Sequence, residues 1–272
     1  MTYVDSPDKK QKHPHYEHRT LKLDLKDNEF SSKKFQSLRN YSTEDKIFES
    51  FSRIAMCLNE KPKPTIPTKD LNKVCLILMN DRDFKGKNLG VGPLNDGYLV
   101  GLKHHRFGFK VFYLFNCENQ LFRTYLKFFL INTTDALTVF YSGRDDKIIE
   151  GIEFSDSTFS KIEINDLLMK NCNGKTRVLF ITDSVCGKSV FNVEGCSNMI
   201  SLSVKKSNLL SGYEIEKTHG IFTYYFCKIT SDCPNITPNR LVERMNASLD
   251  RFDEEILCQL SNKELGDSSI FF

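Results

Sequence analysis

The sequence predicts an α/β fold, in which a mainly parallel sheet has helices on both faces. From residue 70 onward, short apolar runs alternate with longer segments whose apolar residues recur at helical spacing. The run 74–79 (Val-Cys-Leu-Ile-Leu-Met) is apolar throughout, as expected for a strand that is covered on both of its faces. Strands and helices that alternate in this way form βαβ units. The 272 residues are enough for one sizeable domain with an extension.

The predicted elements follow one another in a regular order. Strands are expected at 74–79, 109–115, 137–141, 177–181 and 199–204, with an edge strand at 256–260. Helices are expected from a cap at Asn95-Asp96 to about His105, at 121–130, 164–170 and 221–229, and from Pro238 with a stripe that includes Phe252. A short hairpin is expected at 148–159. In such sheets functional residues gather at the carboxyl ends of the strands.

The N-terminal part of the chain differs from the rest. We predict a polar N-terminal extension over 1–66 and one α/β domain over 67–272. Within the extension, residues 43–59 have the spacing of an amphipathic helix, whose apolar stripe must be buried either on the domain or on a partner. Three prolines within residues 61–67 then predict an extended linker, because proline disfavours helix.

Charge and composition exclude several classes of partner. The net charge is only +3, which is too weak to predict binding to nucleic acid or to anionic lipid. No apolar stretch approaches the roughly 20 residues that span a bilayer, and the first residues lack an apolar signal core. We therefore expect a cytoplasmic protein without a membrane partner. The nine cysteines include no Cys-x-x-Cys pair, so reduced thiols and no zinc site are expected.

The residues that follow two of the predicted strands are the main candidates for catalysis or binding. The strand 137–141 is followed by Ser142-Gly143-Arg144-Asp145, and the strand 177–181 is followed by Thr182-Asp183-Ser184-Val185-Cys186. Because the carboxyl ends of parallel strands meet at one edge of a sheet, these two segments are expected to lie close together. They form the candidate site.

These residues resemble the caspase superfamily, and metacaspases most closely. Members carry Tyr-Ser-Gly-His-Gly at the first strand end and Asp-x-Cys or Ala-Cys at the second. Further short segments along 70–262 resemble the family's motifs and follow them in the same order. They are Asn95-Asp96 with Gly108-Phe109, Ile200-Ser201-Leu202-Ser203-Val204, and Gly220-Ile221-Phe222-Thr223-Tyr224. The resemblance implies a caspase-like α/β/α sandwich. It also implies that active members use a cysteine–histidine dyad, usually cut after Arg or Lys, and in many cases need calcium.

The chain departs from that pattern at both catalytic positions. Arg144 stands where the histidine is expected, and arginine keeps its proton in proteins, so it cannot act as a general base. Read without a gap, Val185 takes the place of the cysteine. If the strand end is one residue longer, Cys186 takes it instead, and both alternatives remain open. The flanking site positions are Gly143, Asp183 and Ser184.

The leading hypothesis is therefore a metacaspase-like pseudopeptidase that binds a protein or peptide, such as an active metacaspase. One alternative is a divergent cysteine endopeptidase with Cys186 as nucleophile and Arg144 stabilising the thiolate. Another is a regulatory or structural module that binds through its N-terminal helix. The histidines, among them His104, His105 and His219, are interpreted as surface or capping residues.

No cofactor is expected from the residues themselves, and calcium is implied by the resemblance alone. Five acidic residues near the hairpin match no standard calcium loop. They are Asp145, Asp146, Glu150, Glu153 and Asp156.

Overall fold

The computed structural model of the chain describes residues 44–60, 64–66, 68–82, 89–146, 148–184, 190–206, 220–249 and 254–271. Several predictions fall outside these ranges. They concern the first 43 residues, parts of the proline-rich linker, Val185, Cys186, His219 and Phe252.

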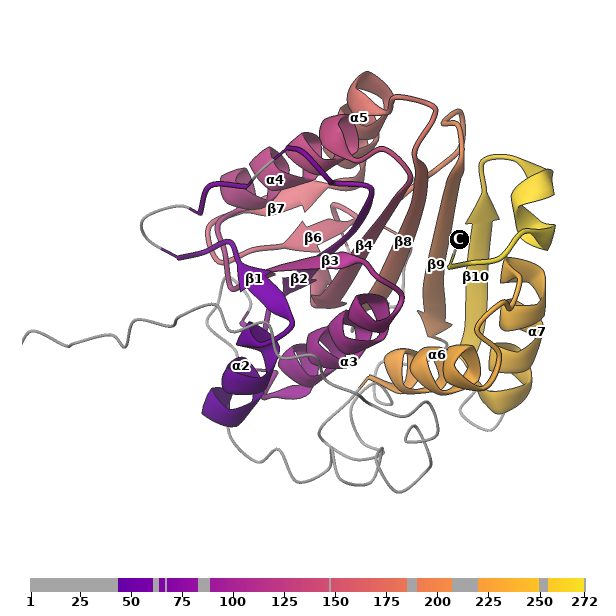
Figure 1. Cartoon of the computed structure of the whole chain (residues 1–272), viewed down its shortest axis with the longest axis horizontal. Helices are drawn as coiled ribbons and strands as arrows, with labels where there is room; N and C mark the ends of the chain where they lie inside the picture. Colours follow the sequence, from indigo (N-terminus) through magenta and orange to yellow (C-terminus); the bar gives the residue numbers. More distant parts are fainter. Residues whose placement is uncertain are drawn as a thin grey trace, which may run out of the picture.

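Within the described residues, seven strands form one sheet in the order β1-β3-β2-β4-β8-β9-β10 (Figure 1). The strands are β1 Ala55–Cys57, β2 Lys73–Met79, β3 Lys110–Phe115, β4 Ala136–Gly143, β8 Arg177–Ser184, β9 Met199–Lys206 and β10 Glu254–Leu260. All neighbours pair in parallel except β10, which runs antiparallel to β9 at the edge. The predicted mainly parallel sheet and its edge strand are confirmed.

Helices cover both faces of this sheet. They are α2 Glu44–Ser52, α3 Gly92–Arg106, α4 Asn119–Asn132, α5 Lys161–Asn171, α6 Ile221–Asp232 and α7 Pro238–Leu249, with a short 3-10 helix η2 Lys263–Asp267. One core lies between the sheet and α2, α3, α6 and α7, and a second lies between the sheet and α4 and α5. Figure 1 shows α4 and α5 on one side of the strands, away from α3, α6 and α7. Because strand side chains alternate between faces, each central strand feeds both cores.

The region predicted as one hairpin is a separate three-stranded sheet. Its strands are β5 Asp145–Asp146, β6 Gly151–Glu153 and β7 Thr158–Ser160, and they pair antiparallel in sequence order. Phe154 and Phe159 are fully buried against Phe122 of α4, so the small sheet is packed onto the main domain. Helix α5 then begins at a capping box between Ser160 and Glu163.

The helix expected over 43–59 is shorter than predicted. It ends at Ser52, and the residues after it form β1, which pairs with β3. The backbone leaves the helix because the edge of β3 offers it hydrogen-bond partners, and Leu58 N donates to Tyr113 O at 2.9 Å. Ile47 and Phe51 are fully buried, and Phe51 stacks on Tyr113 with ring centroids 4.4 Å apart. The apolar stripe is thus buried on the domain.

The start of α3 also differs from the prediction. The helix begins at Gly92 with Pro93 in its first turn, so Asn95 and Asp96 lie inside the helix and do not cap it. Proline is well suited to a first helical turn, because its missing N–H has no partner to lose there. The Asp96 carboxylate is buried, and it bonds to residues from elsewhere in the fold.

Candidate functional site

The carboxyl ends of β4 and β8 meet as expected from the sequence. Ser142 lies opposite Asp183, and Gly143 lies opposite Ser184, in a parallel register. These four residues are buried, and Arg144 follows directly at the strand end with partial exposure. Of the predicted site residues, the structure therefore brings Gly143, Arg144, Asp183 and Ser184 together. Val185 and Cys186 lie outside the described residues.

Two buried carboxylates organise this edge of the sheet. Asp96 of α3 accepts a hydrogen bond from Ser142 Oγ at 3.0 Å and another from the backbone N–H of Gly220 at 2.9 Å. Asp183 accepts from the backbone N–H of Thr223 at 3.0 Å and from its hydroxyl at 2.7 Å. Both carboxylates thus hold the first turn of α6, where the helix dipole favours negative charge.

Gly220 has a packing requirement of its own. A Cβ atom at this position would lie 2.0 Å from Asp183 Oδ2, so only glycine allows the helix start to approach the carboxylate this closely. The sequence analysis named Asp96, Gly220 and Thr223 in segments that resemble the caspase superfamily. It did not predict that Asp96 bonds to Gly220 or that Asp183 bonds to Thr223. Their shared role depends on long-range pairing, which spacing along the chain does not reveal.

Gly143 is similarly confined. A Cβ atom there would lie 2.9 Å from both Asn80 O and Tyr141 Oη. The Tyr141 hydroxyl donates to the backbone oxygen of Arg144, and that oxygen also accepts from Glu153 N at 3.1 Å. The backbone at Arg144 is therefore fixed by β4 on one side and by β6 on the other. Its guanidinium is permanently protonated and supplies no base at this edge.

The described histidines lie elsewhere. His104 is fully buried, with Nδ1 2.8 Å from Val100 O and Nε2 3.0 Å from Thr138 Oγ1. Thr138 precedes Ser142 by four strand residues, about 13 Å towards the amino edge. Burial lowers the pKa of His104 to about 4. The interpretation of His104 as a surface or capping residue was wrong, because both ring nitrogens have partners inside the core. His105 is exposed at the end of α3.

One described cysteine lies near the carboxyl edge. Cys117 follows β3 and is buried, and burial is the main cause that raises its pKa to about 12. A thiol with so high a pKa stays protonated at neutral pH and is a poor nucleophile. Cys227 of α6 is also buried, with a pKa raised to about 12 mainly by burial. Neither thiol offers a replacement for the expected catalytic cysteine.

The acidic residues of the small sheet do not gather as calcium ligands. Asp156 accepts from Asn119 N at 3.0 Å, whereas Glu150 lies 3.7 Å from Lys161 Nζ. Across the described ranges, no three His, Cys, Asp or Glu side chains are placed to share a metal ion. A calcium site thus does not fit the described residues. The same ranges hold no helix that is long and apolar enough to cross a membrane.

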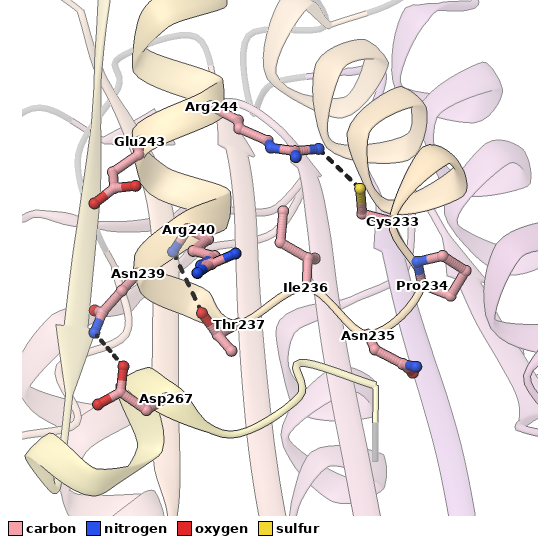
Figure 2. Close-up of a pocket in the computed structure, with 10 residues that line it drawn as sticks. All are labelled: Cys233, Pro234, Asn235, Ile236, Thr237, Asn239, Arg240, Glu243, Arg244 and Asp267. Atoms are coloured by element: carbon pink, nitrogen blue, oxygen red, sulfur yellow. Dashed lines mark hydrogen bonds between the residues drawn. The ribbon is translucent and has the colours of Figure 1, made fainter.

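A hollow of about 850 Å³ lies far from the strand ends (Figure 2). It is bordered by the α6–α7 connection, α7 and η2, and Arg244 Nη1 lies 2.8 Å from Cys233 Sγ at its rim. Cys233 follows the last residue of α6, whereas Thr223 is in the first turn, so about 15 Å of helix separates them. None of the predicted site residues lines this hollow.

Comparison with known proteins identifies the architecture. No protein-family model matches the chain, and no curated protein sequence matches it. Among solved structures, protein GSU0716 from Geobacter sulfurreducens, a structural genomics target, aligns with a TM-score of 0.57 at 12% identity, over 74% of this chain and 98% of that one. The Drosophila initiator caspase Dronc aligns with a TM-score of 0.52 at 10% identity, over 73% of this chain and 81% of Dronc. The fold is caspase-like. At these identities the caspase-like fold is shared without any statement about activity.

Proposed function

We propose that this protein is a catalytically inactive, metacaspase-like pseudopeptidase that binds a protein or peptide at the carboxyl edge of its sheet. The observation that carries the proposal is Arg144, at the strand end beside the Gly143–Ser184 pair. A peptidase of this type needs a group there that takes up and releases a proton near neutral pH. A guanidinium does neither, because arginine side chains keep their proton in proteins.

The binding part of the proposal rests on the buried, hydrogen-bonded side chains at the carboxyl edge of the sheet. Ser142, Asp96 and Asp183 are buried and hydrogen-bonded, and they hold α6 against the strand ends. These bonds fix the shape of the edge, which supports the proposal that a partner binds there. We propose a protein or peptide partner, for which an active metacaspase is a candidate, and a cytoplasmic location.

A divergent cysteine endopeptidase is the second candidate. One observation favours it: Gly220, which follows His219 in the chain, lies against Asp183 at this edge. In that case Cys186 would be the nucleophile, and a cationic neighbour such as Arg144 would lower the pKa of its thiol. The third hypothesis, binding through the N-terminal helix, loses support because Ile47 and Phe51 are buried within the domain.

Restoring the missing group tests the proposal. We expect purified Arg144→His protein to cleave reporter peptides ending in Arg, Lys or Asp only if Cys186 occupies the nucleophile position, and the wild-type protein to cleave none. Arg144→Gln is the matched control, because it removes the charge without adding a base. Covalent labelling of wild-type Cys186 by an electrophilic peptide, at a rate well above that of free cysteine, would favour the active peptidase instead.

A further inference from the structure

Two segments on the α4–α5 side of the molecule touch through their ends. One is the exit from α5 at Cys172, and the other is the turn that leads into β9. Asn198 Nδ2 donates to Gly174 O at 2.8 Å, and Cys172 Sγ lies 3.8 Å from Ser197 O. A Cβ atom at Gly174 would lie 4.0 Å from Ser197 Cβ. The two segments are therefore in van der Waals contact.

This contact brings two cysteines together. Cys172 and Cys196 are both free thiols with partial exposure. Cys196 Sγ lies 3.5 Å from the sulfur of Met169, which is one turn before Cys172. Residues three apart share a face of a helix, so Cys196 lies over the face that ends at Cys172. Burial is the main cause that raises the pKa of Cys196, and the charge of Cys172 is the second, so the two thiols are within electrostatic reach.

We propose that Cys172 and Cys196 are a reversible redox pair that forms a disulfide when the cell is exposed to hydroperoxide. One thiolate attacks the peroxide, its O–O bond breaks, and a sulfenic acid forms together with one alcohol or water molecule. The second thiol then displaces the hydroxyl as water, and the S–S bond closes. The two sulfurs are oxidised by two electrons, which the hydroperoxide accepts. Two molecules of glutathione reverse the reaction and become glutathione disulfide, or one dithiol reductant does so and closes its own disulfide.

The bond would act on the segment that returns from the candidate site. Residues 190–198 are the described part of the connection between β8 and β9. Phe191 already stacks on Phe180 of β8, with ring centroids 4.3 Å apart, and Phe180 precedes Ser184 by four residues. A link between Cys196 and α5 would tie the other end of this segment. Oxidation would thus restrict the chain beside the site, whether that site cuts peptides or only binds them.

The test uses the full-length protein equilibrated in glutathione buffers of graded redox ratio, or treated with hydrogen peroxide. Peptide mapping by mass spectrometry should find Cys172 linked to Cys196, and dithiothreitol should release the link. The melting temperature should rise by roughly 5 °C on oxidation, since a closed loop of about 25 residues constrains the unfolded chain.

Serine variants define the specificity of the effect. Cys172→Ser and Cys196→Ser should each abolish both the link and the rise in melting temperature. Cys233→Ser, at a half-exposed cysteine elsewhere on the surface, should leave both unchanged. The proposal is overturned if both thiols stay reduced in wild-type protein while other cysteines oxidise, or if either of them pairs with Cys186. Both of these contradicting results are measured on wild-type protein, so a poorly folded variant would not obscure them.

Discussion

Gly143 at the end of β4 lies directly opposite Ser184 at the end of β8. This pairing joins the two strand ends that form the candidate site. It places Arg144 at the edge with its backbone held by Tyr141 and Glu153. The described strand ends are therefore held together by sheet pairing and by hydrogen bonds to the backbone at Arg144.

Gly143→Ala should destabilise the protein by about 1–3 kcal/mol, because the new methyl group would press on Asn80 O and Tyr141 Oη. Gly90→Ala is a useful comparison. Gly90 has a positive φ of 75°, and a Cβ atom added there would meet no atom of the described residues beyond its chain neighbours within 4 Å, so it reports backbone strain without a described clash. Urea unfolding should give a larger loss for Gly143→Ala. A loss well below about 1 kcal/mol for Gly143→Ala would show that the close approach at Gly143 is unimportant.

Asp183→Asn should cost about 1–3 kcal/mol, because it removes a buried charge that accepts two hydrogen bonds at the start of α6. Thr223→Val removes only the hydroxyl contact and should cost less. The double variant should show non-additivity, since the two side chains share a bond. Strict additivity in urea unfolding would contradict the direct contact.

Because His104 is buried, we expect the free energy of unfolding to depend on pH in a defined way. Its pKa in the folded protein is about 4, below its ordinary value, because burial disfavours the charged ring. The unfolded chain therefore binds the proton first as the pH falls. The contribution to stability is complete above about pH 6.5 and is lost progressively towards pH 4, by about 3 kcal/mol in all.

His104→Gln isolates this effect from other titrations. Its free energy of unfolding should decline less steeply than that of wild-type protein between pH 6.5 and 4. The charged neighbour Lys103 is the same in both proteins, so its influence cancels to first order. His105→Gln should also flatten the curve, but by less, because burial lowers the pKa of the exposed His105 ring less than that of the fully buried His104. Parallel curves for His104→Gln and wild-type protein would refute the assignment.

Phe51→Ala should destabilise the protein by about 3–5 kcal/mol, because Phe51 is fully buried between α2 and the sheet. Phe48→Ala, one turn away and only partly buried, should cost less. Thermal unfolding distinguishes the two. A small effect of Phe51→Ala would mean that α2 contributes little to the domain core.

The alternation of apolar runs was enough to predict the parallel sheet and its helices. Runs such as 74–79 became strands because burial on both faces requires continuous apolar residues. The sequence did not reveal that residues 55–57 leave the helical pattern to pair with β3, since that choice depends on a distant strand edge. Nor did it reveal the extra length of β4 and β8, whose last residues are polar but buried by tertiary contacts.

For the site, the sequence predicted that Arg144, Asp183 and Ser184 lie at one edge, because parallel strands end together. It did not predict the bonds from Asp96 and Asp183 to α6, which join residues more than a hundred positions apart in one case. His104 was misread because its partner Thr138 is remote in sequence.

The central claim is that no proton can be relayed at the strand ends. Its most direct test is the turnover of reporter peptides ending in Arg, Lys or Asp by purified wild-type protein, measured beside Cys186→Ala and His219→Ala. The account predicts that all three proteins cleave at the same background rate. Wild-type turnover that disappears in either variant would contradict it.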